Sequence, residues 1–248
     1  MGSALTTSAV GVAGAGSLEV RWIFPGRLET AVSRWFERFP AETESREDGY
    51  LLDPDLSGLS VKVRAGRALE VKAYCGSPGI LDVADRARGR MQSWLKWSFG
   101  LIPSQESGDP VCWMPVYKRR RTCRFSLAGG QIVAGVSGGP VCAVELTEIR
   151  TRGEFWWSLG FEATGRANLP RALEGTAALV FTPALPGGVE LVTDNSKSYA
   201  EWLCQTPLSS TWPGFPRASS LWARTTSTPR NARCIASRST GSGSTSTQ

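Results

Sequence analysis

Charged and apolar residues alternate along several short segments of this chain, with the charges two positions apart. In the segment LEVRWIF, the apolar positions Leu18, Val20 and Trp22 are separated by Glu19 and Arg21. Successive side chains of a β-strand point to opposite faces, so this spacing predicts a strand with one apolar face and one charged face.

The same alternation recurs in at least five more segments. Their charged or polar positions are Lys62 and Arg64, Glu70 and Lys72, Lys118 and Arg120, Glu145 and Thr147, and Glu162. For any single strand, the simpler interpretation is a half-buried antiparallel strand whose charged face meets water. Charges of both signs on so many strands, beside amphipathic helices that need an apolar sheet face, favour another interpretation. If the helices cover the apolar face and the sheet closes, the charged face lines a barrel.

A charged lining of this kind is costly. An unpaired buried cation costs several kcal/mol, so a cluster of Lys and Arg inside a barrel persists only with water, carboxylates or an anionic ligand. A barrel of about eight strands is wide enough to hold one small ligand. The expected ligand is therefore small and strongly negative.

The remaining pattern divides the chain into expected elements. Helices are expected at 27–39, 79–97, 168–180 and 195–204, because apolar residues recur there at helical spacing or because cap residues precede the segment. Strands are expected at 18–24, 59–64, 68–74, from 112 to 118 onward, 131–136, 141–149, 154–163 and 188–192. A polar link follows the first helix, Ala65-Gly66-Arg67 predicts a hairpin, and glycine-rich turns predict a meander after residue 112.

The two ends of the chain differ from its middle. Residues 1–17 are small and polar, and residues 205–248 are dominated by Ser, Thr, Pro, Gly and Arg. Such segments bury too little apolar surface to offset their ordering entropy, so we expect both to be disordered. The 248 residues, of which 41% are hydrophobic, suit one substantial domain, expected at 18–204.

The net charge of +6 is not spread over the chain. Five arginines and no acidic residue follow Glu201, and the rest of the chain holds 23 basic against 22 acidic residues. The run Lys118-Arg119-Arg120-Arg121 could form a nucleic-acid or nuclear-import patch, but on a strand Arg119 and Arg121 face away from the other two. We therefore expect no nucleic-acid partner.

Residue types and segments that the sequence lacks exclude several kinds of catalytic site and cellular location. The chain has no histidine, which excludes Ser-His, Cys-His and His-zinc mechanisms, and any metal held by carboxylates and water would be Mg²⁺ or Mn²⁺. Six scattered cysteines without a C-x-x-C pair predict buried thiols of a reducing compartment. No apolar run approaches the ~20 residues of a membrane span, and the start lacks a secretory signal. We expect an intracellular location, cytoplasmic or nuclear.

Taken in order, these segments resemble the CYTH family, also called triphosphate tunnel metalloenzymes, which includes class IV adenylyl cyclases, thiamine triphosphatases and inorganic tripolyphosphatases. The resemblance covers residues 18 to about 204. The matching pieces are the first strand EVR, the hairpin VKVR and EVK, the strand with Lys118 and Arg120, the pair VELTEI and GFEATG, and the closing helix SYAEWL.

The resemblance implies an α+β fold, in which an eight-stranded antiparallel barrel, closed or nearly closed and open at both ends, has amphipathic helices outside. Its lumen would bind a small polyanion, such as a nucleoside triphosphate, thiamine triphosphate or polyphosphate. The implied phosphate contacts are Lys62, Arg64, Lys72, Lys118 and Arg120, with Arg21 as a further cation, and the implied Mg²⁺ or Mn²⁺ ligands are Glu19, Glu145 and Glu162.

The chain also departs from the family pattern. The first strand of the family typically reads Glu-x-Glu-x-Lys, where this chain has Arg21 and Ile23 in place of the second carboxylate and the lysine. Thr147 and Thr164 stand where further carboxylates are typical. Losing two or three ligands weakens a bound metal, and a guanidinium cannot activate water because it stays protonated.

Two classes of function therefore remain open, namely a metal-dependent triphosphatase or cyclase-like enzyme and a non-catalytic module that binds a nucleotide or polyphosphate. Under a third interpretation, the charged face simply meets water on an open sheet. The sequence leaves open whether the chain is a monomer or a homodimer.

Overall fold

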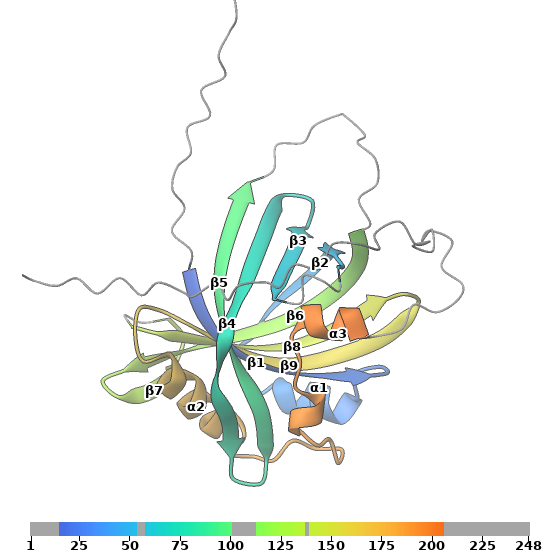
Figure 1. Ribbon diagram of the computed structural model, residues 1–248. Coiled ribbons are helices and arrows are strands. Elements are labelled where there is room, and N and C mark those ends of the chain that lie inside the picture. The colour runs from blue at the N-terminus through green and yellow to red at the C-terminus, as the bar shows by residue number, and fades with distance from the viewer. Residues whose placement is uncertain (1–14, 54–57, 101–112, 137–138, 206–248) are drawn as a thin grey trace, which may run out of the picture. The chain divides into compact units, whose positions relative to one another are not determined.

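In the described part of the computed structural model, nine strands form one antiparallel sheet, and eight of them close into a barrel (Figure 1). The structure describes residues 15–53, 58–100, 113–136 and 139–205. Of the segments expected to be disordered, 1–17 and 205–248, residues 1–14 and 206–248 lie outside the described residues. The expectation is wrong for 15–17, which begin β1, and for Gln205, which ends α3. The strands are β1 Ala15–Pro25, β2 Glu42–Leu51, β3 Leu59–Arg64, β4 Ala68–Val83, β5 Ala87–Gly100, β6 Trp113–Ala128, β7 Gln131–Ala134, β8 Val141–Thr151 and β9 Glu154–Thr164.

The barrel follows the strand order β2-β3-β4-β5-β1-β9-β8-β6, and a pairing between β2 and β6 closes it. Strand β7 pairs with the last residues of β6, outside the ring of eight. The helices are α1 Thr30–Phe36, α2 Leu169–Val180, the 3₁₀ turn η2 Thr193–Asn195 and α3 Tyr199–Gln205. None of the described helices is long and apolar enough to cross a membrane.

The main hydrophobic core lies outside the barrel wall. On β1, Leu18, Val20 and Trp22 are almost fully buried, and they belong to one cluster with side chains of α1, such as Phe36, and of α2, such as Leu173. The helices thus cover the apolar outer faces of the strands. The charged faces are left to point inward, and the expected barrel with helices outside is confirmed.

A second, smaller core fills one end of the barrel interior. On β1, Ile23 lies two residues after Arg21 on the same inward face, and it is buried together with residues of β2, β6, β8 and α3. These residues are Tyr50, Met114, Val116, Ile149, Trp202 and Leu203. The resemblance implied a barrel open at both ends, whereas in this chain apolar side chains fill one end beneath α3.

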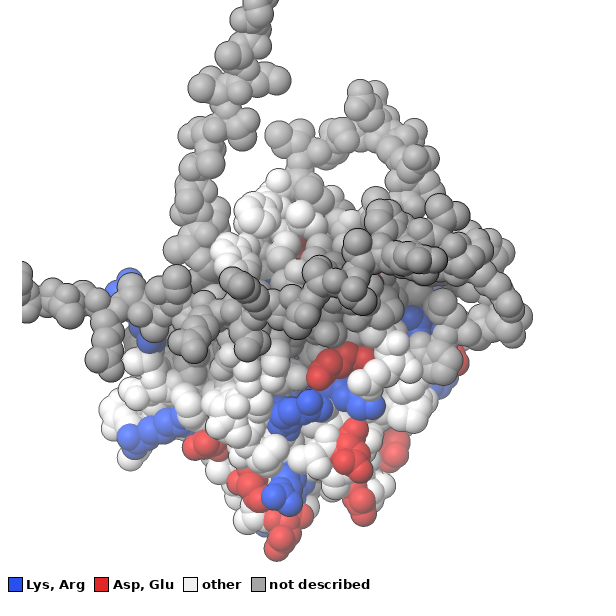
Figure 2. Space-filling model, viewed as in Figure 1, with Lys and Arg blue, Asp and Glu red and all other residues white. Residues whose placement is uncertain are grey.

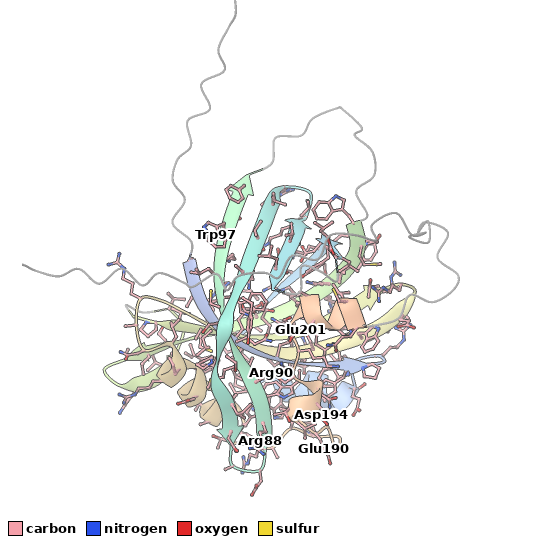
Figure 3. All side chains as sticks on the ribbon, in the orientation of Figure 1. Arg88, Arg90, Trp97, Glu190, Asp194 and Glu201 are labelled. Atoms are coloured by element: carbon pink, nitrogen blue, oxygen red, sulfur yellow. The ribbon has the colours of Figure 1, made fainter. Side chains whose placement is uncertain are left out.

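Helix α3 is held in place by its first residues. The backbone N–H of Ser198 donates to Glu201 Oε2 at 2.8 Å, and the N–H of Glu201 donates to Ser198 Oγ at 3.1 Å. This reciprocal pair is a capping box, which defines the start of a helix. The Glu201 carboxylate also accepts a hydrogen bond from Gln92 on β5. It pairs with Arg90 of the same strand, and Figure 3 labels both residues of this pair. The side chain that caps α3 therefore also ties the helix to the barrel wall.

The helix expected at 79–97 is wrong, because this segment forms the end of β4 and most of β5. Ala84 and Asp85 form the tight turn between them, both with positive φ. On β5, the inaccessible positions Ala87, Gly89 and Met91 alternate with more exposed arginines, which is the period of a strand. The helical interpretation merged the apolar residues of two strands into one stripe.

The polar link expected after the first helix is also wrong, because it contains β2. This strand pairs with β3 and β6 and closes the ring. It lacks apolar alternation because its outward positions Thr43, Ser45 and Glu47 are polar, like its inward ones. The strand expected at 188–192 is reduced to one bridge between Leu191 and Ala87.

At Gly89, β5 lies close to the buried side chains of β1. A Cβ atom added there would lie 2.6 Å from Val20 Cγ2 and 2.6 Å from Trp22 Cζ2. We expect Gly89→Ala to lower the free energy of unfolding by about 1 to 3 kcal/mol in urea titrations, because the core around Trp22 must shift. Gly16→Ala, where no atom lies within 4 Å, is the control and should change stability by less than about 0.5 kcal/mol. Equal stability of the two variants would contradict this packing.

Candidate functional site

The inward faces of the barrel strands enclose a cavity of about 280 Å³. Tyr199 of α3 lines it where it meets the apolar end, so the cavity is closed on that side. All nine residues that the sequence suggested as ligand contacts line this one cavity: Glu19, Arg21, Lys62, Arg64, Lys72, Lys118, Arg120, Glu145 and Glu162. The structure therefore brings together the whole predicted set, while the role of each residue stays a prediction.

Glu145 on β8 is held between two arginines. Arg21 Nη2 lies 3.2 Å from Glu145 Oε2, and Arg120 donates to the other carboxylate oxygen. Burial alone would raise the pKa of Glu145, but Arg120 and Arg21 outweigh it and hold this pKa well below its usual range. Glu145 is thus an ionised carboxylate with both oxygens already engaged.

Arg21 fits into the lumen because its neighbour on β9 is a glycine. A Cβ atom on Gly160 would lie 2.8 Å from Arg21 Cζ. The guanidinium also lies 4.5 Å from the centre of the Tyr199 ring and donates to Ser158 Oγ at 3.3 Å. The segment GFEATG therefore supplies space for a cation as well as the carboxylate of Glu162.

Asp48 on β2 is fully buried and compensates three cations. Its carboxylate lies 3.2 Å from Lys118 Nζ, 3.7 Å from Lys62 Nζ and 3.0 Å from Arg46 Nε. Burial would raise the pKa of Asp48, but Lys118, Lys62 and Arg46 together lower it. Lys118 also donates to the Tyr50 hydroxyl at 2.6 Å, which joins the charged part of the lumen to its apolar end.

Glu70 on β4 forms two further ion pairs of the lumen. It lies 3.0 Å from Lys62 Nζ and 3.2 Å from Arg64 Nη1. Burial opposes its ionisation, but Lys62 and then Arg64 lower the pKa of Glu70 to about 2. This carboxylate stays ionised at any pH near neutral.

Glu19 and Glu162 are direct neighbours on β1 and β9 and share one lysine. The Lys72 ammonium donates to Glu19 Oε1 and lies 3.3 Å from Glu162 Oε1. Burial alone would raise the pKa of Glu19, but Lys72 outweighs it and lowers this pKa. The pKa of Glu162 is instead raised, mainly by the negative charge of Glu19 and secondly by burial. Lys72 has a raised pKa, since the two carboxylates outweigh its burial.

These contacts decide whether the predicted metal ligands fit a metal ion. Both oxygens of Glu145 hold arginines, and the Lys72 ammonium lies between Glu19 and Glu162. Within the described ranges, no three His, Cys, Asp or Glu side chains are grouped so that they could hold a metal ion. The residues present therefore do not fit a resident Mg²⁺ or Mn²⁺ ion.

Cations outnumber carboxylates in the lumen. The lining holds nine Lys and Arg side chains against four Glu, and Glu42, Glu44 and Asp48 supply further partners from β2. Within the described residues, these seven carboxylates against nine cations leave an excess of two positive charges. Lys96 lines the cavity but forms no ion pair within 4 Å in the part of the chain that the structure describes. By contrast, exposed basic and acidic side chains are interspersed on the face in Figure 2.

Sequence reasoning missed several lumen residues. Arg46, Asp48 and Tyr50 lie two apart on β2, so the same spacing rule could have found them in the segment assigned as a link. Lys96 was missed because it lies in the segment 79–97, which the sequence analysis wrongly predicted to be a helix. Tyr199 had no such signal, because only the tertiary position of α3 brings it to the cavity.

No protein-family model matches this chain, and no curated protein matches it. Among solved structures, the RNA triphosphatase Pct1 of S. pombe in complex with the Spt5 CTD is 9% identical at a TM-score of 0.37, over 62% of this chain and 73% of that chain. HpAC1 of Hippeastrum, described as a putative adenylyl cyclase that reveals a dominant triphosphatase activity, is 9% identical at a TM-score of 0.34, over 71% of this chain and 91% of that chain. At these TM-scores the likeness carries no argument about function.

The lowered pKa of Glu70 predicts a pH dependence of stability. Its pKa is about 2 in the folded protein against an ordinary 4.5, so its stabilising effect is complete above pH 4.5 and is lost as the pH falls toward 2. We expect Glu70→Gln to be less stable at neutral pH and to lose less stability on acidification, as measured by urea unfolding. Glu174→Gln, at an exposed position of α2, should follow the wild-type profile. A Glu70→Gln profile parallel to wild type would contradict the ion pairs.

Proposed function

We propose that the lumen binds a small phosphate-rich anion, with the phosphate chain inside the barrel. The single observation that carries this proposal is the excess of Lys and Arg, most of them buried or half-buried, around one cavity closed at its apolar end. Buried cations that exceed their partners are stabilised by an anion that enters from the mouth. The resemblance to the CYTH family supports the same ligand class.

Unsatisfied polar atoms support the same proposal. Arg120 Nε and Thr147 Oγ1 are buried and have no hydrogen-bond partner within the described residues. The two residues are directly opposite each other on β6 and β8, on the inward faces of these strands. Buried polar groups of proteins almost always have partners, so a bound anion or water at this position would complete the site.

The size of the cavity limits which part of a ligand it holds. Pockets for drug-sized ligands measure about 300 to 1,000 Å³, so a cavity of about 280 Å³ suits a short phosphate chain. A nucleoside or thiamine group attached to such a chain would remain at the mouth. Tripolyphosphate is therefore the minimal ligand, and nucleoside triphosphates and thiamine triphosphate are extended ones.

Binding without hydrolysis is the activity that the side chains support best. A hydrolase needs a group that activates water, and the lumen carboxylates of the described chain already compensate Lys or Arg. The competing function is the metal-dependent triphosphatase that the family resemblance implies. Measured phosphate release from tripolyphosphate, ATP or thiamine triphosphate with Mg²⁺ or Mn²⁺ separates the two, and robust turnover would contradict the binding module.

Lys96 offers a clean test of anion binding, because it forms no ion pair within 4 Å with any carboxylate of the described residues. We expect tripolyphosphate at 100 times its dissociation constant to stabilise the wild type by about 2.7 kcal/mol in thermal-shift measurements. Loss of one charge-assisted hydrogen bond costs about 1.5 to 3 kcal/mol, so Lys96→Ala should weaken binding about tenfold to a hundredfold in calorimetric titrations.

Arg119→Ala is the matched control, since Arg119 lies on the outer face of β6 between two lumen cations and pairs with Glu148. Its tripolyphosphate affinity should equal that of the wild type. Equal losses in Lys96→Ala and Arg119→Ala would show non-specific attraction to the surface. No stabilisation of the wild type by any phosphate chain would end the proposal.

A further inference from the structure

Lys72 occupies a position between two carboxylates that could otherwise share a metal ion. Glu19 and Glu162 are paired on neighbouring strands, and the Lys72 ammonium contacts one oxygen of each. Ser17 Oγ also donates to Glu19 at 2.9 Å. All of these side chains except Ser17 line the lumen, so the ammonium lies within the proposed phosphate site.

The chemistry of this position is that of a small cation. Mg²⁺ and similar ions in phosphate sites are held by one or two carboxylates, with phosphate oxygens and waters completing the shell. An ammonium carries one positive charge and three N–H donors. Two of these donors serve Glu19 and Glu162, and the third is left for a phosphate oxygen. Lys72 can thus link the carboxylates to a phosphate chain, as a metal ion would.

We propose that Lys72 takes the place of a divalent cation between Glu19 and Glu162, so that the lumen binds phosphate chains without metal and removal of the ammonium creates a metal site. The first half of this inference rests on the proposed function, and the second half does not. Arg21 also works against metal binding, because it engages Glu145, the third carboxylate that the sequence suggested as a metal ligand.

The primary experiment measures metal binding in the absence of any phosphate. Free Mn²⁺ is quantified by its electron paramagnetic resonance signal during titration of the full-length protein. We expect no stoichiometric binding to the wild type and one Mn²⁺ per chain in Lys72→Ala. The affinity should rise about tenfold or more, because the ammonium no longer repels the ion and two carboxylates become free.

Three matched variants test the assignment. Lys72→Arg retains the charge and should bind no Mn²⁺. Lys96→Ala removes the lysine directly opposite Lys72 on β5, which contacts neither carboxylate within 4 Å in the described structure, and should also bind none. In the double variant Lys72→Ala with Glu162→Gln, the gained Mn²⁺ site should be lost.

The second measurement addresses phosphate binding. Tripolyphosphate should bind the wild type equally well with excess EDTA and with Mn²⁺, whereas Lys72→Ala should bind it more tightly when Mn²⁺ is present. If the wild type binds no phosphate chain, the proposed function fails, but gain of a Mn²⁺ site in Lys72→Ala still supports the replacement.

Two outcomes would overturn the inference. Stoichiometric Mn²⁺ binding to the wild type without phosphate would show that the ammonium does not exclude the ion. A folded Lys72→Ala that binds no more Mn²⁺ than Lys96→Ala would show that the two carboxylates form no latent site. The wild-type titration keeps the inference testable even if Lys72→Ala does not fold.

Discussion

Charge compensation inside a closed sheet is the constraint on which the rest of this structure depends. Each buried cation needs a counter-charge or a ligand, since an uncompensated ion in the interior costs several kcal/mol. In this barrel, carboxylates on neighbouring strands meet that need in small groups. Asp48 forms ion pairs with three cations, and Glu145 forms ion pairs with two arginines. Lys72 forms ion pairs with two carboxylates. The register that places Glu19 beside Glu162 is therefore an electrostatic requirement as well as a hydrogen-bonding one.

The polar lumen also explains why the hydrophobic core lies on the outer side of the wall. Strands with one charged face must bury the other, and α1 and α2 cover it on β1, β6, β8 and β9. Where the inward positions become apolar, as at Ile23 and Val116, the lumen ends and α3 covers it. The change from Arg21 to Ile23 within one strand thus determines where the cavity stops.

Much of this arrangement was predictable from alternation alone. The spacing of Glu19 and Arg21, and of Lys62 and Arg64, correctly placed these side chains on one inward face. The rule failed where a strand had few apolar residues, as in β2, and where two strands joined by a tight turn imitated a helix, as around Ala84. The pairing of each carboxylate with a particular cation could not be predicted, because it depends on strand order and register across the barrel. The place of Tyr199 in the lumen could not be predicted either, because it depends on the tertiary position of α3.

The ion pairs also bear on how the lumen could accept a ligand. A cation that shares a carboxylate with others, such as Lys62 beside Asp48 and Glu70, can turn toward a phosphate while the carboxylate keeps another partner. Binding then exchanges partners without leaving a charge uncompensated, and side chains already held in place lose little further entropy. Lys72 differs, because the two carboxylates would lose their shared partner if it moved away. Under the proposed function, Lys72 would therefore bind phosphate from its present position, as a fixed positive charge in the wall of the barrel.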